Sequence, residues 1–432
     1  MCCISRSIKN VVLIFAALLL GFLSSTFAGA SSDVTPKGAP AEIKVAWVDY
    51  YSGPGATMGI PEKQAVEWLV DKFNKEGGIR GVKIKLLLVD EMGGPDKQVM
   101  EYRRITLDEK VDVICGYTSS ASCLAIRSVA EELDTLTLLQ NCGSHRITEE
   151  SKLNYIFRTA NTQVSECVMA ARYLLEIKPD LKTIAGMNED FAWGRDNWEA
   201  FKIAIQTLKP DVKVATALWT RFQAGEYSAE VSKLLAVKPE FIYSSLWGGG
   251  QVAFVKQAAP RGLFKRSLVF FNTGENPLQE YKKEMPDGVM ICGRATVGYF
   301  LYPSPDKNPR QKEFVEGIKS RYGRYPDFTC YRAYQTLAGL KAAYEKAIDQ
   351  VGKWPSTQEV VSAFEGLKWD TVSGPIEMRL DHQAVHSGII GMTKFSPKYG
   401  FPILDRIKKF PAEEIMPPYG MKTLDWLKTL KK

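Results

Sequence analysis

Ile43–Phe73 reads IKVAWVDYYSGPGATMGIPEKQAVEWLVDKF, and its order of residues sets the pattern for most of the chain. The largely apolar run Ile43–Val48 predicts a buried strand, and a turn containing glycine and proline follows over Tyr50–Gly59. Pro61 is expected to open a helix, because proline is favoured in the first helical turn. Apolar residues then recur at the spacing of one helix face as far as Phe73. The segment predicts a strand–turn–helix unit.

The same alternation continues along the chain. The further predicted strands are Val82–Asp90, Val111–Gly116, Leu136–Gln140, Thr183–Asn188, Val212–Trp219, Phe241–Leu246, Leu268–Asn272 and Gly288–Cys292. Helices are predicted from near Pro95 and over 122–133, 164–177, 195–208, 227–236, 251–259, 310–321, 329–349 and 357–366. Most of these strands are continuous apolar runs, which is typical of a parallel sheet covered by helices on both faces. From about 374 the tail returns to short strand-like pieces and ends in a basic helix.

The N-terminus has the layout of a cleaved secretory signal. Arg6 and Lys9 precede the apolar run Val11–Leu23, and an A-x-A pattern ends at Ala30. The alternative is a membrane anchor, but the run is shorter than the roughly 20 residues that a spanning helix needs. We therefore expect residues 1–30 to be removed and the mature protein to be free in a bacterial periplasm.

The length after the signal indicates two lobes, because about 400 residues exceed the size at which a single core stops growing. The pattern of strands and helices starts again after Arg158–Gln163, without a long linker. We predict an α/β fold of two doubly wound, Rossmann-like lobes joined by several chain crossings. The formal net charge is +7, and acidic and basic residues interleave, which argues against a nucleic-acid partner.

Six cysteines lie outside the signal, and none shows the C-x-x-C spacing of a redox or zinc site. They are Cys115, Cys123, Cys142, Cys167, Cys292 and Cys330. Buried small side chains are the favoured interpretation, although an oxidising compartment would allow disulfides. The first pair to test is Cys115 with Cys142, since both end predicted strands that should be neighbours.

The loops that follow the strands are the candidate binding segments, because ligands of open α/β sheets bind beyond the carboxyl ends of the strands. These loops are Asp49–Pro54, Tyr117–Ser120, Asn141–Ser144, Asn188–Gly194, Trp247–Gly250 and Thr273–Asn276. Those of the first half supply hydroxyls and backbone N–H groups suited to an anion. Those of the second half supply aromatic rings and acids suited to an apolar wall and a cation. Taken singly, each of these polar or aromatic residues has an alternative interpretation, as an ordinary helix cap or as a core residue.

Five segments together resemble the leucine/isoleucine/valine-binding protein family, the periplasmic receptors of branched-chain amino-acid type ABC importers. They are Ile43–Ala65, Asn74–Gly81 (NKEGGIRG), Val111–Ser120 (VDVICGYTSS), Asn154–Ala160 (NYIFRTA) and Asp190–Gly194 (DFAWG). The likeness runs from about residue 42 to 395. It implies a type I periplasmic binding fold with a three-crossing hinge near 158–163, 294–298 and 379–388. The implied lobes are 42–160 with 295–378 and 161–294 with 379–432, after a flexible lead at 31–41.

The resemblance also implies a ligand site between the lobes. The implied residues are Ser120, Gly143 and Ser144 for the ligand carboxylate, Trp193 and Trp247 as aromatic walls, Glu275 for its ammonium and Met58 in the lining. Gly143 stands where the family has a threonine, and the tryptophans stand where smaller tyrosines are usual. The implied ligand is accordingly an amino acid or a related carboxylate or amide, with urea and aromatic acids among the family's alternatives.

The resemblance implies a monomeric carrier that closes on its ligand and delivers it to an inner-membrane permease. A sensory module of the same fold is the alternative, since fold alone does not separate sensing from transport.

The sequence gives little support for an enzyme. His382 and His386 are four residues apart, but no glutamate directly follows His382 as in a zinc protease. The chain has no phosphate-binding G-x-x-x-x-G-K-[ST] loop, nucleophile elbow or dinucleotide fingerprint. We therefore expect no catalytic residue, metal or cofactor, and an exported α/β enzyme is the least favoured alternative.

Overall fold

The computed structural model describes residues 35–294 and 296–431. The predicted signal over 1–30 and the first residues of the flexible lead lie outside this part of the chain. Within it, no helix combines the length and hydropathy that a membrane crossing requires.

The first sheet has five parallel strands in the order β2-β1-β3-β4-β5, so the predicted parallel architecture is confirmed here. Its strands are β1 (Glu42–Asp49), β2 (Lys83–Asp90), β3 (Val113–Gly116), β4 (Thr137–Leu139) and β5 (Ile156–Arg158). The helices between them are α1 (Ala56–Lys75), α2 (Gly94–Leu107), α3 (Ser120–Glu132) and α4 (Arg146–Glu149). Because the strands are parallel, the loops after β1, β3 and β4 lie at one edge.

Helix α1 begins at Ala56, so the prediction that Pro61 opens it is wrong by more than a turn. The Gly/Pro turn allows the earlier start, because Gly59 packs so closely on the Tyr50 carbonyl that a Cβ there would lie 1.9 Å from its oxygen. Pro61 lacks an N–H group for the carbonyl of Thr57, four residues earlier. The Asn276 side-chain amide donates to that carbonyl instead, at 3.1 Å.

The second sheet has seven strands in the order β15-β14-β10-β9-β8-β6-β7. Its parallel strands are β6 (Thr183–Glu189), β7 (Lys213–Thr220), β8 (Phe241–Ser244), β9 (Leu268–Phe271) and β10 (Met290–Cys292). The antiparallel strands β14 (Gly388–Ser396) and β15 (Phe401–Phe410) extend it beyond β10, and are longer than the short pieces expected of the tail. The associated helices are α5 (Gln163–Ile177), α6 (Ala192–Leu208), α7 (Ser228–Val237), α8 (Gly248–Ala258), α9 (Leu278–Tyr281), α13 (Ala412–Ile415) and α14 (Thr423–Leu427).

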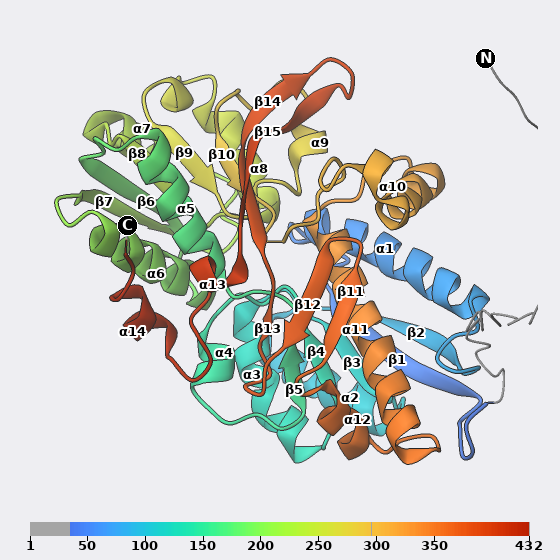
Figure 1. The fold of residues 1–432 in the computed structure, drawn as a ribbon. Coiled ribbons are helices and arrows are strands. Elements are labelled where there is room, and N and C mark those ends of the chain that lie inside the picture. Colours follow the sequence, from blue (N-terminus) through green and yellow to red (C-terminus); the bar gives the residue numbers. More distant parts are fainter. Residues whose placement is uncertain (1–34, 295, 432) are drawn as a thin grey trace, which may run out of the picture. The chain divides into compact units, whose positions relative to one another are not determined.

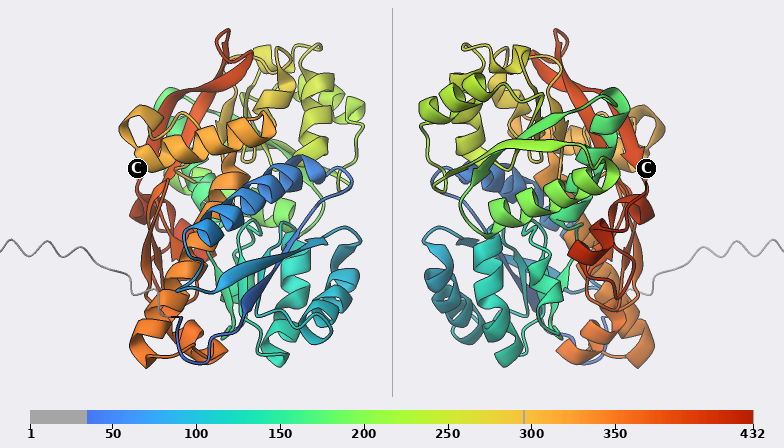
Figure 2. Two further views of the ribbon diagram at one scale, coloured as in Figure 1. Left: turned by 90° about the vertical axis from the view of Figure 1, so that its right-hand side faces the viewer. Right: turned by 90° about the vertical axis from the view of Figure 1, so that its left-hand side faces the viewer.

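One face of the first sheet is covered by helices from distant parts of the chain. The later helices are α10 (Pro309–Tyr322), α11 (Phe328–Val351) and α12 (Thr357–Phe364). Their apolar residues share one core with Val45, Trp47 and Val113 of the sheet, and α10 and α11 lie beside α1 in Figures 1 and 2. A small sheet of β11 (Lys368–Thr371), β12 (Gly374–Met378) and β13 (Ala384–Val385) continues this side.

We propose the division into lobes that the resemblance implies, 42–160 with 295–378 and 161–294 with 379–432. The three predicted crossings lie close together. The Arg158 N–H donates to the His382 carbonyl at 2.8 Å, and the Ile389 N–H donates to the Thr296 carbonyl at 3.3 Å. Since β13 pairs with β12, the third crossing falls at the end of its predicted range, after Val385.

The disulfide joins Cys123 to Cys142, with the two Cα atoms 6.5 Å apart, so the suggested pairing of Cys115 with Cys142 is wrong. The physical reason is the alternation of side chains along a strand. Cys115 points into the core that α1 and α11 cover, whereas Cys123 and Cys142 belong to the core on the opposite face. Cys115, Cys167 and Cys330 are free thiols within the described chain, as the favoured interpretation predicts.

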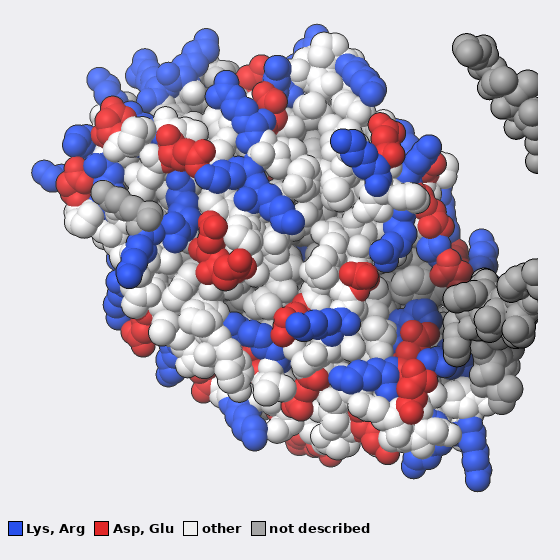
Figure 3. Space-filling model, in the orientation of Figure 1, with Lys and Arg blue, Asp and Glu red and all other residues white. Residues whose placement is uncertain are grey.

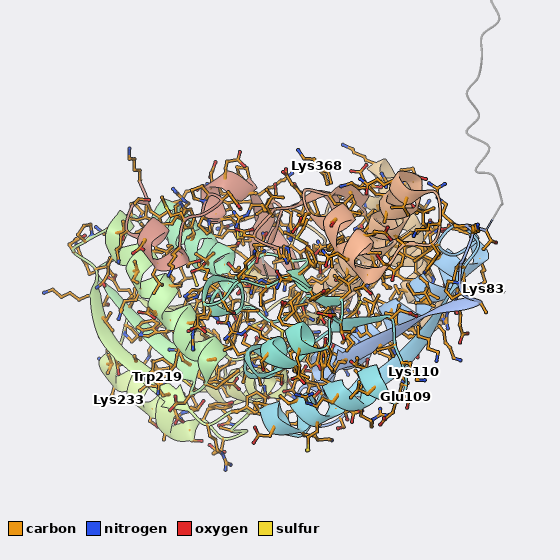
Figure 4. All side chains as sticks on the ribbon, turned by 90° about the horizontal axis from the view of Figure 1, so that it is seen from below. Lys83, Glu109, Lys110, Trp219, Lys233 and Lys368 are labelled. Carbon is orange, nitrogen blue, oxygen red and sulfur yellow. A yellow bond between two sulfur atoms is a disulfide. The ribbon has the colours of Figure 1, made fainter. Side chains whose placement is uncertain are left out.

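Acidic and basic side chains interleave over much of the face drawn in Figure 3. Figure 4 shows Lys83 and Lys110 at the end of the first sheet where β2 begins and β3 is about to begin, which is the end opposite to the loops after β1, β3 and β4. It places Trp219, on the edge strand β7, at the outer margin of the second sheet.

Candidate functional site

Loops from both sheets meet around one small cavity. It is lined by Met58, Thr118, Phe191, Trp193, Trp247, Thr273 and Arg294. Met58 and Thr118 belong to segments that follow strands of the first sheet, and the other residues follow strands of the second. The cavity measures about 10 Å³, which is room for roughly one water molecule. The two sets of loops are therefore in contact, and a larger solute needs them to part.

Three of the implied residues come together in the apolar wall of this cavity. Met58, Trp193 and Trp247 form a buried cluster with Tyr50 and Phe328. The Trp193 indole N–H donates to the carbonyl of Ser245 at 2.9 Å, which fixes the ring. The ring centres of Tyr50 and Trp247 lie 5.8 Å apart across the two sets of loops. The site is thus dominated by aromatic surface.

Ser120 and Ser144 are fully buried, and their polar groups are used within the protein. The Ser144 N–H donates to the Ser120 hydroxyl oxygen at 3.2 Å. The Ser144 hydroxyl donates to the carboxylate of Asp196 on α6, which connects the two sets of loops. Burial raises the pKa of Asp196 to about 6. Neither serine belongs to the cavity lining.

The two backbone N–H groups just before α3 already have an acceptor. The N–H groups of Thr118 and Ser119 donate to the two carboxyl oxygens of Glu91, at 2.7 and 2.9 Å. Glu91 is fully buried, and desolvation, reinforced by the nearby Asp49, raises its pKa to about 8. The turn that leads into α3 is therefore bonded to one of the chain's own side chains.

Glu275 lies beside the cavity, in the loop that contributes Thr273. One of its carboxyl oxygens accepts the Phe328 N–H at the start of α11, at 2.6 Å. Burial and the neighbouring Asp327 raise the pKa of Glu275 well above its ordinary value. This glutamate and Asp327 together meet the N-terminus of α11, since Asp327 caps the helix.

Arg294 is the principal lining residue that the sequence reasoning missed. The residue is 2% exposed, its Nε lies 2.5 Å from the Glu166 carboxylate, and its Nη1 donates to the Asn141 carbonyl at 2.9 Å. The guanidinium carbon lies 4.1 Å from the centre of the Trp193 ring. Nη2 has no hydrogen-bond partner among residues 35–294 and 296–431. A signal was present, because Arg294 comes two residues after the predicted strand Gly288–Cys292, but the resemblance assigned this segment to the hinge and not to the ligand site.

Gly143 lies where Arg294 and Trp193 meet. A Cβ at this position would lie 2.2 Å from Cζ3 of Trp193 and 2.5 Å from Nη2 of Arg294. Both distances are far below a van der Waals contact. The missing side chain at Gly143 is therefore the space in which the guanidinium and the indole fit.

The histidines are engaged in the fold. The His382 ring stacks on Phe157 with ring centres 3.8 Å apart, and its nitrogens contact the Ile156 carbonyl and the Glu365 carboxylate. Across the residues that the structure describes, no cluster of three or more His, Cys, Asp or Glu residues is arranged to hold a metal.

Known proteins share this architecture. Leu/Ile/Val-binding protein homolog 3 of Brucella melitensis is 24% identical over 329 residues, which cover 75% of this chain and 84% of that protein. An ABC-transporter solute-binding protein from R. palustris, solved with benzoate, has a TM-score of 0.74 at 20% identity, covering 87% of this chain and 99% of that one. One from Rhodopseudomonas palustris BisB5, solved with 3,4-dihydroxybenzoic acid, has a TM-score of 0.75 at 22% identity, covering 86% and 98%.

Two sheets with loops that meet at their carboxyl ends define a binding protein of the type I periplasmic fold, as the sequence predicted. The family model described as periplasmic binding protein matches residues 42–395, and the chain belongs to this family. The resemblance to the leucine/isoleucine/valine-binding proteins is confirmed by the relatives.

Proposed function

We propose that this protein is the solute-binding component of an ABC importer, which captures a small amino acid or a related carboxylate or amide. The observation that carries this proposal is the cavity where Met58, Trp193, Trp247 and Arg294 meet from loops of both sheets. A small solute in this position is enclosed by apolar rings and contacts few polar groups, as in most ligand pockets.

The ligand is captured by closure of the two lobes. Several contacts join the loop sets across the cavity: among them, the Gly249 N–H donates to the Pro54 carbonyl at 3.1 Å, Asn276 donates to Thr57, and Ser144 donates to Asp196. These contacts break when the lobes part about the crossings near 158–163, 294–298 and 385–388. A ligand that adds contacts in the closed state shifts the population toward it.

Within the site, Met58, Trp193 and Trp247 form the wall against the apolar part of the ligand. Ser120, Gly143 and Ser144 belong to the adjoining loops on the first lobe, and Glu275 belongs to the loop on the second lobe that contributes Thr273. The similar proteins have names or titles that mention branched-chain amino acids and benzoates, and the aromatic lining found here suits an apolar side chain or ring.

The protein acts without chemical turnover, as a monomer in the periplasm after removal of its signal. An inner-membrane permease recognises the closed lobes and receives the ligand. Family membership supports this role, because a periplasmic binding protein releases the same molecule that it captures.

Thermal unfolding with a panel of amino acids, amides, urea, and aliphatic and aromatic acids tests the function. A ligand at 100 times its dissociation constant stabilises the fold by about 2.7 kcal/mol, which is readily measured. Isothermal titration then gives the affinity, and NMR of the recovered ligand checks that it is unchanged. A panel without any binder contradicts the proposed function, and turnover of a bound compound contradicts the carrier role.

A further inference from the structure

We propose that Arg294 holds the acid group of the ligand, and that the ligand is an apolar or aromatic carboxylate without an ammonium group. This inference rests on the proposed function and narrows it, because it moves the carboxylate contact away from Ser120 and the 141–144 loop.

The first argument is the unused donor on Arg294. A guanidinium offers five N–H groups in a fixed fork that matches a carboxylate. Glu166 and the Asn141 carbonyl occupy Nε and Nη1, and these contacts orient the group. Arg294 lines the cavity, and its Nη2, which lies against Gly143, makes no hydrogen bond to any described part of the chain. A buried donor without a partner is costly, so an acceptor supplied by the ligand is favoured at this atom.

The second argument is that the competing anion site is filled from within. The N–H groups of Thr118 and Ser119 are bonded to Glu91, and the Ser144 N–H is bonded to the Ser120 hydroxyl. The Ser144 hydroxyl is bonded to Asp196. A ligand carboxylate placed at these groups would have to displace carboxyl and hydroxyl groups that already satisfy them. Arg294 requires no such displacement.

The third argument is the absence of a side chain at Gly143. The loop after β4 carries no side chain where one would collide with Nη2 of Arg294 and with the Trp193 ring. The guanidinium lies in the space that a side chain at this position would occupy, so the absence of one leaves room for a cationic donor.

The rest of the lining offers no acid to pair with an ammonium group. The described lining residues other than Arg294 are methionine, threonine, phenylalanine and tryptophan, and none is acidic. Glu275 lies outside the lining and already accepts the Phe328 N–H. One cation surrounded by aromatic surface therefore matches a monocarboxylate with a ring or an apolar chain.

The test compares benzoate, the neutral isostere benzamide and the zwitterion L-phenylalanine by isothermal titration. The wild-type protein should bind benzoate about 10- to 100-fold more tightly than the other two, because a hydrogen bond to a charged group is worth more than a neutral one. The double variant E166Q/R294Q replaces the buried ion pair by two neutral amides, so neither charge is left unpaired. It should lose most of the preference for benzoate and keep its affinity for benzamide.

Two further variants complete the design. R294K keeps the charge but not the fork, and it should bind benzoate with an affinity between those of the wild type and the double variant. R195Q is the matched control, because Arg195 is an exposed arginine on α6 that pairs with Asp190, and it should bind as the wild type does. Circular dichroism and thermal unfolding establish that each variant is folded.

The outcomes separate the two proposals. Equal affinity of the wild type for benzoate and benzamide, tighter binding of an amino acid, or unchanged benzoate binding by the folded double variant would overturn the role of Arg294 and leave the binding function in place. Absence of binding by the wild type across the whole panel would overturn the proposed function, and the role of Arg294 with it.

Discussion

The guanidinium carbon of Arg294 lies 4.1 Å from the centre of the Trp193 ring, in the core of the contact between the two sets of loops. Cations above indole rings are attracted by the negative face of the ring, and more strongly when water is excluded. The same guanidinium is bonded to Glu166 at the start of α5 and to the Asn141 carbonyl after β4. This one side chain therefore links segments that follow strands of both sheets.

Removing the indole should weaken ligand binding without unfolding the protein. We expect Trp193→Ala to reduce the affinity for the best ligand of the panel about 10- to 100-fold, since buried aromatic side chains dominate binding energies. Trp219→Ala is the control, because Trp219 lies on the edge strand β7 and is not part of the cavity lining. Isothermal titration measures both, and equal losses in the two variants would contradict the assigned wall.

Breaking the buried ion pair should be more harmful than neutralising it. Glu166→Ala leaves the buried Arg294 cation without its counter-ion, which should lower the free energy of unfolding by about 3–5 kcal/mol. The double variant E166Q/R294Q should lose less than E166A alone. Urea unfolding measures all three proteins. A double variant that is the less stable of the two would show that the pair stabilises the fold through its charges.

Glu91 should make the stability depend on pH. Burial raises its pKa from 4.5 to about 8, so the folded protein binds this proton more tightly than the unfolded chain. Its contribution is complete below pH 4.5 and is lost as the pH rises to about 8. Between these values the wild type should lose up to about 1.4 kcal/mol per pH unit more than Glu91→Gln, the value for one proton.

Urea unfolding at pH 5, 7 and 9 checks the effect of Glu91. Glu189, whose pKa burial also raises to about 8, is present in both proteins and cancels in the comparison. Parallel pH profiles for the wild type and Glu91→Gln would mean that Glu91 titrates as an ordinary carboxyl group.

The disulfide should contribute measurably to stability. Cys123 and Cys142 are separated by 19 residues, and a loop of this size corresponds to about 3 kcal/mol in the chain-entropy description. Cys142→Ser should lose about this amount, whereas reduction of the variant should have no further effect. Peptide mapping without reduction should find the Cys123–Cys142 link, and a link from Cys115 would contradict the structure.

The sequence predicts the strands well because most of them are continuous apolar runs, and such runs have few alternatives in a parallel sheet. The prediction that Pro61 opens α1 is wrong for a tertiary reason. The proline leaves the Thr57 carbonyl without its helical partner, and Asn276, more than 200 residues later, donates to that carbonyl instead. The sequence fails for Cys115 because the direction of a side chain on a short buried strand cannot be read from an unbroken apolar run. The apolar pattern of the sequence locates the strand, but it does not show which of its side chains point to which face of the sheet.

The candidate site is only partly accessible from the sequence, for a related reason. Met58, Trp193 and Trp247 follow strands and could be selected by that position alone. Arg294 could not be distinguished from a surface arginine, because its burial depends on Glu166 and Gly143, which are distant in the chain. The bonding of Glu91 to the turn before α3 is equally a tertiary effect.

The shared core of the first sheet has a consequence for the order in which the molecule can fold. Strands β1 to β5 are synthesised long before α10, α11 and α12, yet one face of that sheet is buried by those later helices. A nascent chain ending near residue 294 would expose a broad apolar surface and could not complete either lobe. Folding that is delayed until the last third of the chain has been synthesised avoids that exposure.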